Sequence, residues 1–430
     1  MRRSDRQNIL IAGSGAREHA FAAKLAASSR VERVFIAPGN GGTSAVGENV
    51  SIGIDQFEEL AAFAAEKRAL TIVGPEAPLV AGIRDVFERA GLPMVGPSAA
   101  AARLEGSKIF SAQINREFGI PQPRFEAFSD LDSAVDAIRS RRFRNPVVKA
   151  DGLAGGKGVA LPESLEDAAG AIRSMMADLV FGDAGRQIVI QERVDGVEFS
   201  LMALVDGRDI QFFPPIQDHK RIGEDDAGDN TGGMGAYAPV PETLLPTSVV
   251  RAAERTIALP LVAGMARRGT PFQGILFVGI IAGSDGPQVI EYNVRGGDPE
   301  IPTILPLLES DLFDHLTAIV EGRLAASPMR FKTESAVNIV LASGGYPGAY
   351  RTGFEIVQSN VPGDIDVYHA GTTRGADGVL KTAGGRVFNV VATADRLEAA
   401  RVKALAAADS ISFNDKYFRR DIGAKAMIEA

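Results

Sequence analysis

The chain has 430 residues, 45% of them hydrophobic, so it is long enough for two to four globular domains. Its formal net charge of -8 argues against a broad binding surface for nucleic acid or for an anionic membrane. It contains no cysteine and only 4 histidines, which excludes disulfides, thiolate metal sites and cysteine nucleophiles and argues against a histidine-rich metal site.

Long apolar segments are missing from the sequence. No apolar run reaches the length of about 18 residues that a membrane-spanning helix needs. The apolar stretch before Gly13 is too short for the core of a signal peptide. We therefore expect a cytoplasmic protein that neither spans a membrane nor binds nucleic acid.

The first 105 residues alternate short apolar runs with amphipathic stretches, the pattern of a parallel sheet covered by helices. We expect strands at 8–12, 33–37, 70–73 and 93–95, and helices near 17–28, 56–68 and 79–90. The strands run into glycine- and proline-rich turns, and ligands of such sheets bind beyond the carboxyl ends of the strands. Residues 1–105 are therefore predicted to form an N-terminal α/β substrate-binding domain.

The turn GSGAREHA, which starts at Gly13, joins the first expected strand to the first expected helix. Backbone N–H groups at such a helix start can hold a phosphate, whereas the plainer interpretation is a tight structural turn. A dinucleotide fingerprint fits poorly, because Glu18 stands where the third glycine should be and the second strand does not end in an acid. Phosphate binding and a structural turn both stay open from this stretch alone.

The rest of the chain divides into four further segments. Residues 106–122 are predicted to form a connector helix that ends at Gly119. Residues 123–190 have the size of a lid, and we expect strands at 124–128, 146–150, 159–161 and 187–191 and helices at 131–142 and 163–178. Long strands and a helix near 248–268 predict a mixed central sheet in 191–325, and the strand-rich segment 326–430, with a helix at 395–408, is predicted to be a small C-terminal domain.

The loop KADGLAGGKGV, from Lys149 to Val159, is rich in glycine and joins two expected strands. A Walker-type phosphate loop is excluded, because Gly158 follows Lys157 where serine or threonine is needed and because a strand follows instead of a helix. A glycine hairpin can nevertheless lie flat over a triphosphate, with its N–H groups and lysines as partners. The alternative is a flexible surface hairpin with incidental lysines.

The stretch VIEYNVRGGDPE places Glu291, Asn293 and Arg295 at alternate positions. In a strand these side chains project from one face. Carboxylate and amide oxygens suit Mg²⁺, which takes few protein ligands and completes its shell from phosphates and water. A nearby arginine can stabilise the charge of an acyl phosphate. The alternative is a solvent-facing strand with a surface ion pair.

The segment QDHKRIGEDDAGDNTGGMGAY, residues 217–237, is a long loop rich in acids and glycines. Loops of this length in compact domains are usually functional or disordered. Asp218, His219, Lys220 and Arg221 could orient a charged substrate, and the alternative is a mobile, solvated insertion.

Taken together and in this order, the motifs resemble those of the phosphoribosylamine–glycine ligases, also called glycinamide ribonucleotide synthetases, within the ATP-grasp superfamily. Any single motif is weak, but the ordered set spans about residues 8–425. The stretches are GSGAREHA, APGNGGT, TIVGPEAPLVAGI, LEGSK, KADGLAGGKGV, FGDAG, QDHKR, NTGGMGAYAPVP, EYNVRGGDPE, SGGYPGAYRTG, HAGTT, GGRV and RRDIG.

The resemblance implies an ATP-grasp fold with a preceding parallel α/β domain and a small mixed C-terminal domain. It implies a ligase of purine synthesis that joins glycine to 5-phosphoribosylamine through glycyl phosphate, giving glycinamide ribonucleotide, ADP and phosphate. The implied cofactors are ATP and Mg²⁺, with Mn²⁺ as an alternative, and no obligate protein partner is implied. Phosphoryl transfer of this kind relies on positioning and charge neutralisation, which agrees with the lack of a nucleophilic serine or cysteine constellation.

The resemblance also assigns roles to residues. For ATP it implies phosphate contacts from Lys108 and Lys149, a glycine cover from the lid, adenine contacts at the hinge and a carboxylate for the ribose. In chain order these residues are Lys108, Lys149, Gly155, Gly156, Lys157, Gly158, Gln191, Glu192, Val194 and Glu198.

For the reacting groups, the resemblance implies that Glu291 and Asn293 bind the metal and that Arg295 stabilises the transferred phosphoryl group. Asp218 and Lys220 are further catalytic candidates on the substrate side. The substrate-binding candidates are Asp298 and, for phosphoribosylamine, Gly13, Gly15, Arg17, Asn40 and Glu76.

Three positions depart from the pattern of these ligases. Gln191 stands where glutamate is frequent, and an amide oxygen can still accept from adenine. Ala16 replaces a glycine in the phosphate turn, so that residue is either already helical or makes the anion site tighter. Gly296 replaces a phenylalanine beside Arg295, which puts the rigidity of the substrate pocket in doubt.

The sequence disfavours three other functions. Another ATP-grasp ligase, or a carboxylase that phosphorylates bicarbonate, is disfavoured by the long loop at 217–237. A non-catalytic nucleotide-binding relative is disfavoured by Lys108, Lys149, Glu291, Asn293 and Arg295, which are all in place. A dinucleotide oxidoreductase lacks the third glycine and the ribose-binding acid.

Overall fold

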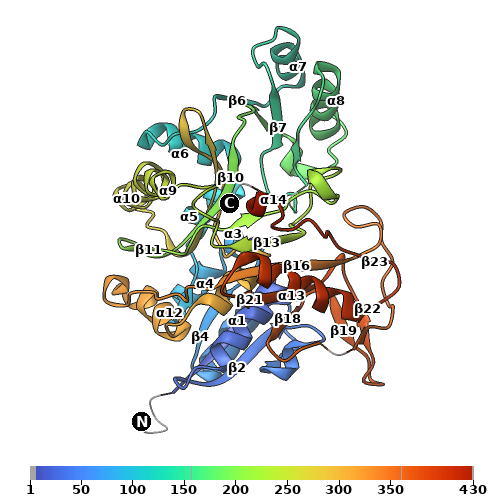
Figure 1. The fold of residues 1–430 in the computed structure, drawn as a ribbon. Coiled ribbons are helices and arrows are strands. Elements are labelled where there is room, and N and C mark those ends of the chain that lie inside the picture. The colour runs from blue at the N-terminus through green and yellow to red at the C-terminus, as the bar shows by residue number, and fades with distance from the viewer. Residues whose placement is uncertain (1–5, 156, 360, 429–430) are drawn as a thin grey trace.

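The computed structural model describes residues 6–155, 157–359 and 361–428. Figure 1 shows the N-terminal segment at the bottom, the segment that carries α7 (Leu131–Arg139) and α8 (Leu165–Met176) at the top, and the C-terminal segment at the right. Parallel and antiparallel sheets occur in separate parts of the chain. The predicted class, a multidomain chain of α/β and α+β parts, is confirmed.

The N-terminal sheet has the strand order β3-β2-β1-β4-β5, and every neighbouring pair is parallel, as predicted. The expected helix at 79–90 is instead two helices, because Gly82 takes a left-handed φ of 91° between them. The elements are β1 (Gln7–Gly13), α1 (Ala16–Ala26), β2 (Val31–Pro38), β3 (Glu48–Asn49), α2 (Phe57–Lys67), β4 (Ala69–Val73), α3 (Glu76–Val80), α4 (Ile83–Arg89) and β5 (Met94–Val95).

The connector differs from the single helix predicted over 106–122. Two helices meet here, α5 (Ala99–Gly106) and α6 (Lys108–Phe118). Ser107 lies between them with an extended backbone, and its hydroxyl accepts the N–H of Phe110 as the N-cap of α6. Gly119 ends α6 in the left-handed region, as predicted for a helix terminus.

The lid sheet has the order β6-β9-β7-β8 and is antiparallel. Its strands are β6 (Phe125–Phe128), β7 (Pro146–Ala150), β8 (Val159–Ala160) and β9 (Ile188–Glu192). The sheet and the helices α7 and α8 bury a small core of their own, which includes Ile138, Val148 and Ile172. This separate core allows the lid to hold its shape on the rest of the molecule.

The central sheet has the order β11-β10-β14-β15 and is antiparallel throughout, so the prediction of a mixed sheet was wrong. Short turns join β10 to β11 and β14 to β15. Two neighbouring strands joined by a short turn run antiparallel, because a parallel pair needs a long crossover connection. The expected helix near 248–268 is continuous, with a π-helical turn at Glu254–Ala258. The elements are β10 (Val197–Asp206), β11 (Ile210–Phe212), α9 (Thr247–Ala253), α10 (Leu259–Arg267), β14 (Gln273–Gly283) and β15 (Gly286–Asn293).

A third large sheet, of order β12-β13-β16-β21-β18 with β23 paired to β16, joins two distant parts of the chain. The segment predicted as a long loop, 217–237, begins with β12 (Gln217–Asp218) and runs into β13 (Gly235–Ala238), which pair as a hairpin with the loop 219–234 between them. Strand β13 pairs with β16 (Ser335–Ser343), so this hairpin belongs to the C-terminal sheet.

The remaining elements complete the C-terminal part. They are α11 (Glu300–Ile304), α12 (Leu312–Glu321), β17 (Val357–Gln358), β18 (Ile365–His369), β19 (Thr372–Arg374), β20 (Leu380–Thr382), β21 (Arg386–Ala394), α13 (Leu397–Ser410), β22 (Ile411–Ser412), β23 (Lys416–Tyr417) and α14 (Lys425–Ile428). The helix predicted at 395–408 is α13, which packs on β16 and β21.

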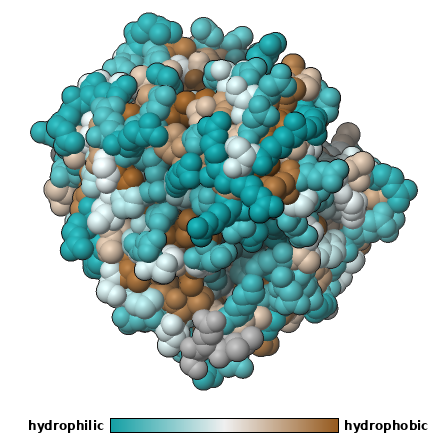
Figure 2. Space-filling model, turned by 90° about the horizontal axis from the view of Figure 1, so that it is seen from above, coloured by the Kyte–Doolittle hydropathy of each residue, from teal (hydrophilic) through white to brown (hydrophobic). Residues whose placement is uncertain are grey.

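The surface seen from above in Figure 2 is covered mainly by polar side chains, with apolar ones in small groups between them. Among the described residues, no helix is both long and apolar enough to cross a membrane.

Candidate active site

A cleft of about 680 Å³ lies where the lid, the central sheet and the β12–β13 hairpin come together. Its lining residues run from Glu76 to Lys425, so it brings together side chains that are far apart in the sequence. The predicted site residues that line it are Glu76, Lys108, Lys149, Gly155, Gly158, Gln191, Glu192, Val194, Glu198, Asp218, Lys220, Glu291, Asn293, Arg295 and Asp298.

Two lysines form one end of the cleft, which we call the phosphate end. Lys149, on β7, is buried, and its Nζ donates to the carbonyl of Ile290 at 2.9 Å. Lys108 begins α6, and its Nζ donates to the carbonyl of Gly152 at 3.1 Å. Burial lowers the pKa of Lys108, and it lowers the pKa of Lys149 to about 8. Two cations with only backbone acceptors are suited to bind an anion.

The glycine hairpin between β7 and β8 reaches the cleft in part. Gly155 takes a φ of 57° and Gly158 packs against Ala154, and both glycines line the cleft. Lys157 points elsewhere, because its Nζ donates to the carbonyl of Pro347 in the C-terminal part at 2.9 Å. Gly156, which the sequence also places in the cover, lies outside the described residues.

The segment after β9 forms the side wall of the cleft. Gln191 is buried and Val194 lines the wall. The carboxylate of Glu192 accepts the backbone N–H of Asn145 at 2.8 Å, so its side chain is already engaged. Glu198, near the start of β10, also lines the wall.

The alternation predicted for β15 holds in the structure. Glu291, Asn293 and Arg295 line the cleft, whereas the residues between them are buried. Lys220 Nζ lies 3.0 Å from Glu291 Oε1, and this attraction lowers the pKa of Glu291 to about 2. Arg295 Nη2 donates to Asn293 Oδ1 at 3.1 Å. The two oxygens predicted to bind metal are therefore each held by a cation of the chain itself.

The donor set suits a metal that shares its shell with a ligand. Among residues 6–155, 157–359 and 361–428, no group of three or more histidine or acidic side chains could hold a metal ion. Glu291 and Asn293 offer one carboxylate and one amide, both hard oxygen donors. A divalent cation here would need further oxygens from phosphates and water, as Mg²⁺ does when it binds with a nucleotide.

Two carboxylates hold Arg295 in place. Its Nε lies 3.3 Å from Glu76 Oε2, and its Nη2 lies 3.3 Å from Glu105 Oε1. Glu105 also accepts the N–H of Val294 at 2.7 Å, and burial raises its pKa to about 7. The sequence reasoning missed Glu105, although it stands in the quoted motif LEGSK three residues before Lys108.

Three carboxylates form the other end of the cleft, which we call the acidic end: Asp218, Asp298 and Glu300. Burial and the nearby Glu300 carboxylate raise the pKa of Asp218 well above its usual value. Glu300 accepts the hydroxyl of Ser200 at 3.0 Å, and sequence reasoning missed it although it ends the motif RGGDPE. This end is chemically fitted to an amine.

The turn at Gly13 and Gly15 lies at the carboxyl end of β1, outside the residues that line the cleft. The carboxylate of Glu18 accepts the N–H of Gly15 at 2.5 Å and the Arg17 Nε–H at 2.7 Å. The turn therefore holds an anion already, namely the side chain of its own helix. Ala16 is the first residue of α1, so it needs no positive φ.

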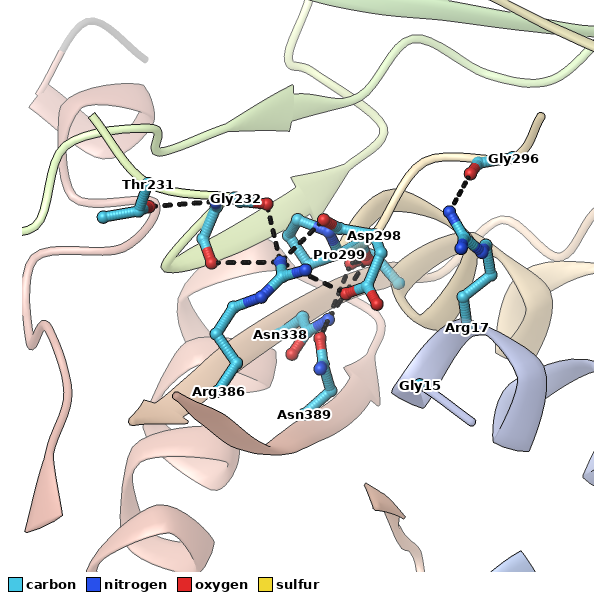
Figure 3. Close-up of polar contacts among 12 residues, drawn as sticks. Gly15, Arg17, Thr231, Gly232, Gly296, Asp298, Pro299, Asn338, Arg386 and Asn389 are labelled. Carbon is cyan, nitrogen blue, oxygen red and sulfur yellow. Dashed lines mark hydrogen bonds and ion pairs between the residues drawn. The ribbon is translucent and has the colours of Figure 1, made fainter. Parts of the chain in front are cut away.

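Arg17 ties the same turn to the residue that follows Arg295. Its Nη1 donates to the carbonyl of Gly296 at 2.9 Å (Figure 3). A Cβ on Gly296 would lie 2.5 Å from Ile301 Cγ1, so Ile301 fills the space next to the glycine. The segment is thus tied to α1 and packed by Ile301.

Asn40 ties the N-terminal sheet to the C-terminal part. Its Nδ2 donates to the carbonyls of Ser14 at 2.9 Å and His369 at 2.7 Å. Its side chain is therefore engaged with the backbone in this structure.

The sequence matches known domains over most of its length. Residues 7–105 match the phosphoribosylglycinamide synthetase N domain, residues 106–301 its ATP-grasp (A) domain, and residues 336–425 its C domain. The chain belongs to the phosphoribosylglycinamide synthetase family. The ATP-grasp part of the predicted fold and the predicted family are thereby confirmed.

Relatives of this family resemble the chain from end to end. The phosphoribosylamine–glycine ligase of Chlorobaculum tepidum is 46% identical over 97% of this chain and 100% of its own length. The crystal structure of the Thermotoga maritima phosphoribosylamine–glycine ligase is 32% identical, with a TM-score of 0.84 over 96% of this chain and 100% of that one.

A more distant structure shares only the fold. The biotin carboxylase domain of the Hydrogenobacter thermophilus 2-oxoglutarate carboxylase, solved with MgADP, is 16% identical, with a TM-score of 0.73 over 96% of this chain and 91% of that chain. The use of ATP and a divalent metal is implied instead by the ATP-grasp domain that residues 106–301 match.

Proposed function

We propose that the chain is a phosphoribosylamine–glycine ligase of purine synthesis, which joins glycine to 5-phosphoribosylamine and converts ATP to ADP and phosphate. End-to-end similarity to enzymes of that name supports the proposal. The observation that carries it is the cleft, which is lined by Lys108, the buried Lys149, Arg295 and the three carboxylates of the acidic end. Such a cleft can hold a triphosphate beside an amine.

The reaction runs in two steps. A glycine carboxylate oxygen attacks the γ-phosphorus of ATP, which forms glycyl phosphate and releases ADP. The amine nitrogen of phosphoribosylamine then attacks the glycyl carbonyl carbon, phosphate leaves, and the amine loses its proton. Lys108 and Lys149 neutralise the phosphates of ATP, and Arg295 stabilises the charge on the transferred group.

The metal of the reaction is Mg²⁺ in this proposal, with Mn²⁺ as an alternative. Glu291 and Asn293 would hold it, because their oxygens are the hard donors of the cleft. When bound, the metal would neutralise phosphate charge during transfer. Lys220 and Arg295 contact these two oxygens in the structure, so both cations lie beside the residues that would hold the ion.

The wall after β9 would bind the nucleoside. Gln191, Glu192 and Val194 would contact adenine, with Glu192 acting through its backbone because its carboxylate is engaged. Glu198 would hold the ribose hydroxyls. The glycine hairpin would cover the phosphates through Gly155, Gly156 and Gly158.

The acidic end would bind the other two substrates. Asp218 and Asp298 would receive their amino groups, and Lys220 would approach the carboxylate of glycine once the metal is bound. Gly13, Gly15, Arg17 and Asn40 would bind phosphoribosylamine. For Glu76, the ion pair with Arg295 supports a different role, which is to hold that guanidinium in place.

We further propose that the protein works in the cytoplasm with small molecules alone, without an obligate protein partner. The division of the chain into 1–105, 106–122, 123–190, 191–325 and 326–430 stays a proposal, with the β12–β13 hairpin assigned to the C-terminal sheet.

One assay tests the function. Phosphate release from MgATP is measured with glycine and phosphoribosylamine added singly and together, and glycinamide ribonucleotide is detected by mass spectrometry. Release is expected only with both substrates. Release driven by bicarbonate would identify a carboxylase, and release indifferent to the ribosylamine would exclude this ligase.

Gly155→Val is expected to raise the KM for ATP about tenfold, because a β-branched residue tolerates the φ of 57° poorly. Gly155→Asn is the matched control, since asparagine adopts left-handed backbone more readily, and its KM should stay within about threefold. Steady-state kinetics with ATP as the varied substrate measures both. Equal KM values for the two variants would show that Gly155 is not part of the cover over ATP.

The affinity for ATP is expected to fall as the pH rises through about 8, the pKa of Lys149 in the free protein. Only the protonated lysine attracts phosphate, so binding is full below that pH and weaker above it. Calorimetric titration of a non-hydrolysable ATP analogue between about pH 6 and pH 10 measures this. Lys149→Arg should flatten the profile, because arginine keeps its proton over this range. A wild-type profile that is flat would contradict the assignment.

A further inference from the structure

We infer that Arg386, a residue of the C domain, positions the acidic end of the cleft for the two substrates that carry amino groups. The inference rests on the proposed function, because it concerns how glycine and phosphoribosylamine are held. It assigns the C-terminal sheet a role in positioning active-site residues.

Arg386 reaches two separate segments with a single guanidinium nitrogen. Its Nη1 donates to the carbonyl of Gly232 at 2.6 Å and to the carbonyl of Asp298 at 2.7 Å, with Gly233 O farther away at 3.4 Å. The same nitrogen lies 3.3 Å from Asp298 Oδ1. Figure 3 shows the guanidinium between the two segments, with the side chain rising from the sheet below them.

The local backbone aims Arg386 at this place. Arg386 begins β21, and the register against β16 shifts between Arg386 and Phe388, so that Val387 is an extra residue in the strand. Such a β-bulge redirects the neighbouring side chains. A regular start of this strand would carry the guanidinium along a different direction.

The hairpin turn is built to receive the guanidinium. A Cβ on Gly232 would lie 3.0 Å from Arg386 Cζ, so the guanidinium occupies the place of a side chain. Tyr346, also in the C domain, accepts the N–H of Gly232 at 3.0 Å. The next residue, Gly233, has a φ of 107°, and a Cβ there would lie 2.8 Å from Asp218 Oδ1. The turn that Arg386 and Tyr346 fix is thus in contact with Asp218.

Arg386 also supplies charge. Asp218, Asp298 and Glu300 gather at the acidic end, whereas Lys220 is paired with Glu291 and Arg295 is held by Glu76 and Glu105. Arg386 is the arginine paired with Asp298, and its side chain is 20% exposed. It stands outside the set of residues that line the cleft, so it acts through Asp298 and the hairpin turn rather than on a substrate.

Three variants of the full-length enzyme test the inference. Arg386→Gln should raise the KM for glycine and for phosphoribosylamine about tenfold or more, while the KM for ATP changes less than about twofold; tenfold corresponds to about 1.4 kcal/mol. Arg386→Lys should restore these values in part, because it keeps the positive charge but lacks the planar guanidinium that lies against Gly232. Tyr346→Phe, which removes one hydroxyl, should raise the same two KM values about threefold.

Arg374→Gln is the matched control. Arg374, on β19 of the same domain, is exposed and donates to the carbonyl of Gly378 at 2.7 Å; neither residue lines the cleft, so the loss of Arg374 should leave all three KM values unchanged. Equal rises for ATP and the other substrates in Arg386→Gln, or a lower melting temperature with unchanged KM values in all three variants, would overturn the inference. If Arg386→Gln does not fold, the KM values of Tyr346→Phe for glycine and phosphoribosylamine are compared with its KM for ATP instead. A wild-type enzyme that makes no glycinamide ribonucleotide would refute the proposed function instead.

Discussion

Glu291→Gln is expected to lower turnover about 100-fold or more at saturating ATP and Mg²⁺, with the fold intact. The carboxylate is the charged member of the predicted metal pair, and an amide in its place leaves two neutral donors. Its ion pair with Lys220 joins side chains that are 38% and 35% exposed, so the loss should cost the folded state no more than about 1 kcal/mol. Steady-state kinetics and thermal unfolding measure the two effects.

Glu126→Gln is the matched control for this change. Glu126 also carries ion pairs, to Arg124 and Arg142, and lies on β6 of the lid outside the cleft residues. Its loss should leave turnover unchanged. If turnover of Glu291→Gln at saturating Mg²⁺ matches wild type, Glu291 is not a metal ligand.

The sequence predicted the parts of the site that depend on local pattern. The alternation of Glu291, Asn293 and Arg295 follows from the period of a strand, and hard donors at alternate positions point to a metal before any fold is known. Lys149 and the glycine hairpin follow from the residues between two apolar strands. These predictions needed no knowledge of distant partners.

The parts that the sequence reasoning missed all depend on distant partners. Glu105 accepts the N–H of Val294 across 189 positions, and Arg386 reaches Asp298 across 88. Nothing in the local pattern around either residue specifies such a partner, although both stand in quoted motifs. Only the packing of the chain separates structural from functional residues within a motif.

The central sheet illustrates the same limit for the fold. Apolar alternation predicted long strands in VEFSLMALVDG and GILFVGIIAG, but strand direction and pairing come from contacts across the chain. The long loop predicted at 217–237 is confirmed over 219–234, which contains no named strand, whereas its two ends form β12 and β13. Strand β13 pairs with β16, about 100 positions later, a partner that the local pattern does not specify.

Lys220→Met is expected to bind the metal more tightly and yet to turn over about 100-fold more slowly. In the structure Lys220 Nζ sits 3.0 Å from Glu291 Oε1, so it competes with the ion for that oxygen and repels it. Without the ammonium, Mn²⁺ binding measured by electron paramagnetic resonance with saturating ADP should tighten about threefold to tenfold. Turnover should fall because the released lysine no longer approaches the reacting carboxylate.

The control for Lys220→Met is Lys403→Met, which removes a lysine paired with Asp364 at 3.1 Å on the exposed surface and should change neither quantity. The two readouts separate two roles for Lys220. A lysine that only neutralises Glu291 would give tighter metal binding with normal turnover, because the metal replaces its charge. Weaker metal binding in Lys220→Met would mean that the ammonium helps to hold the metal–nucleotide complex. The proposal that lysine and metal compete for Glu291 would then be wrong.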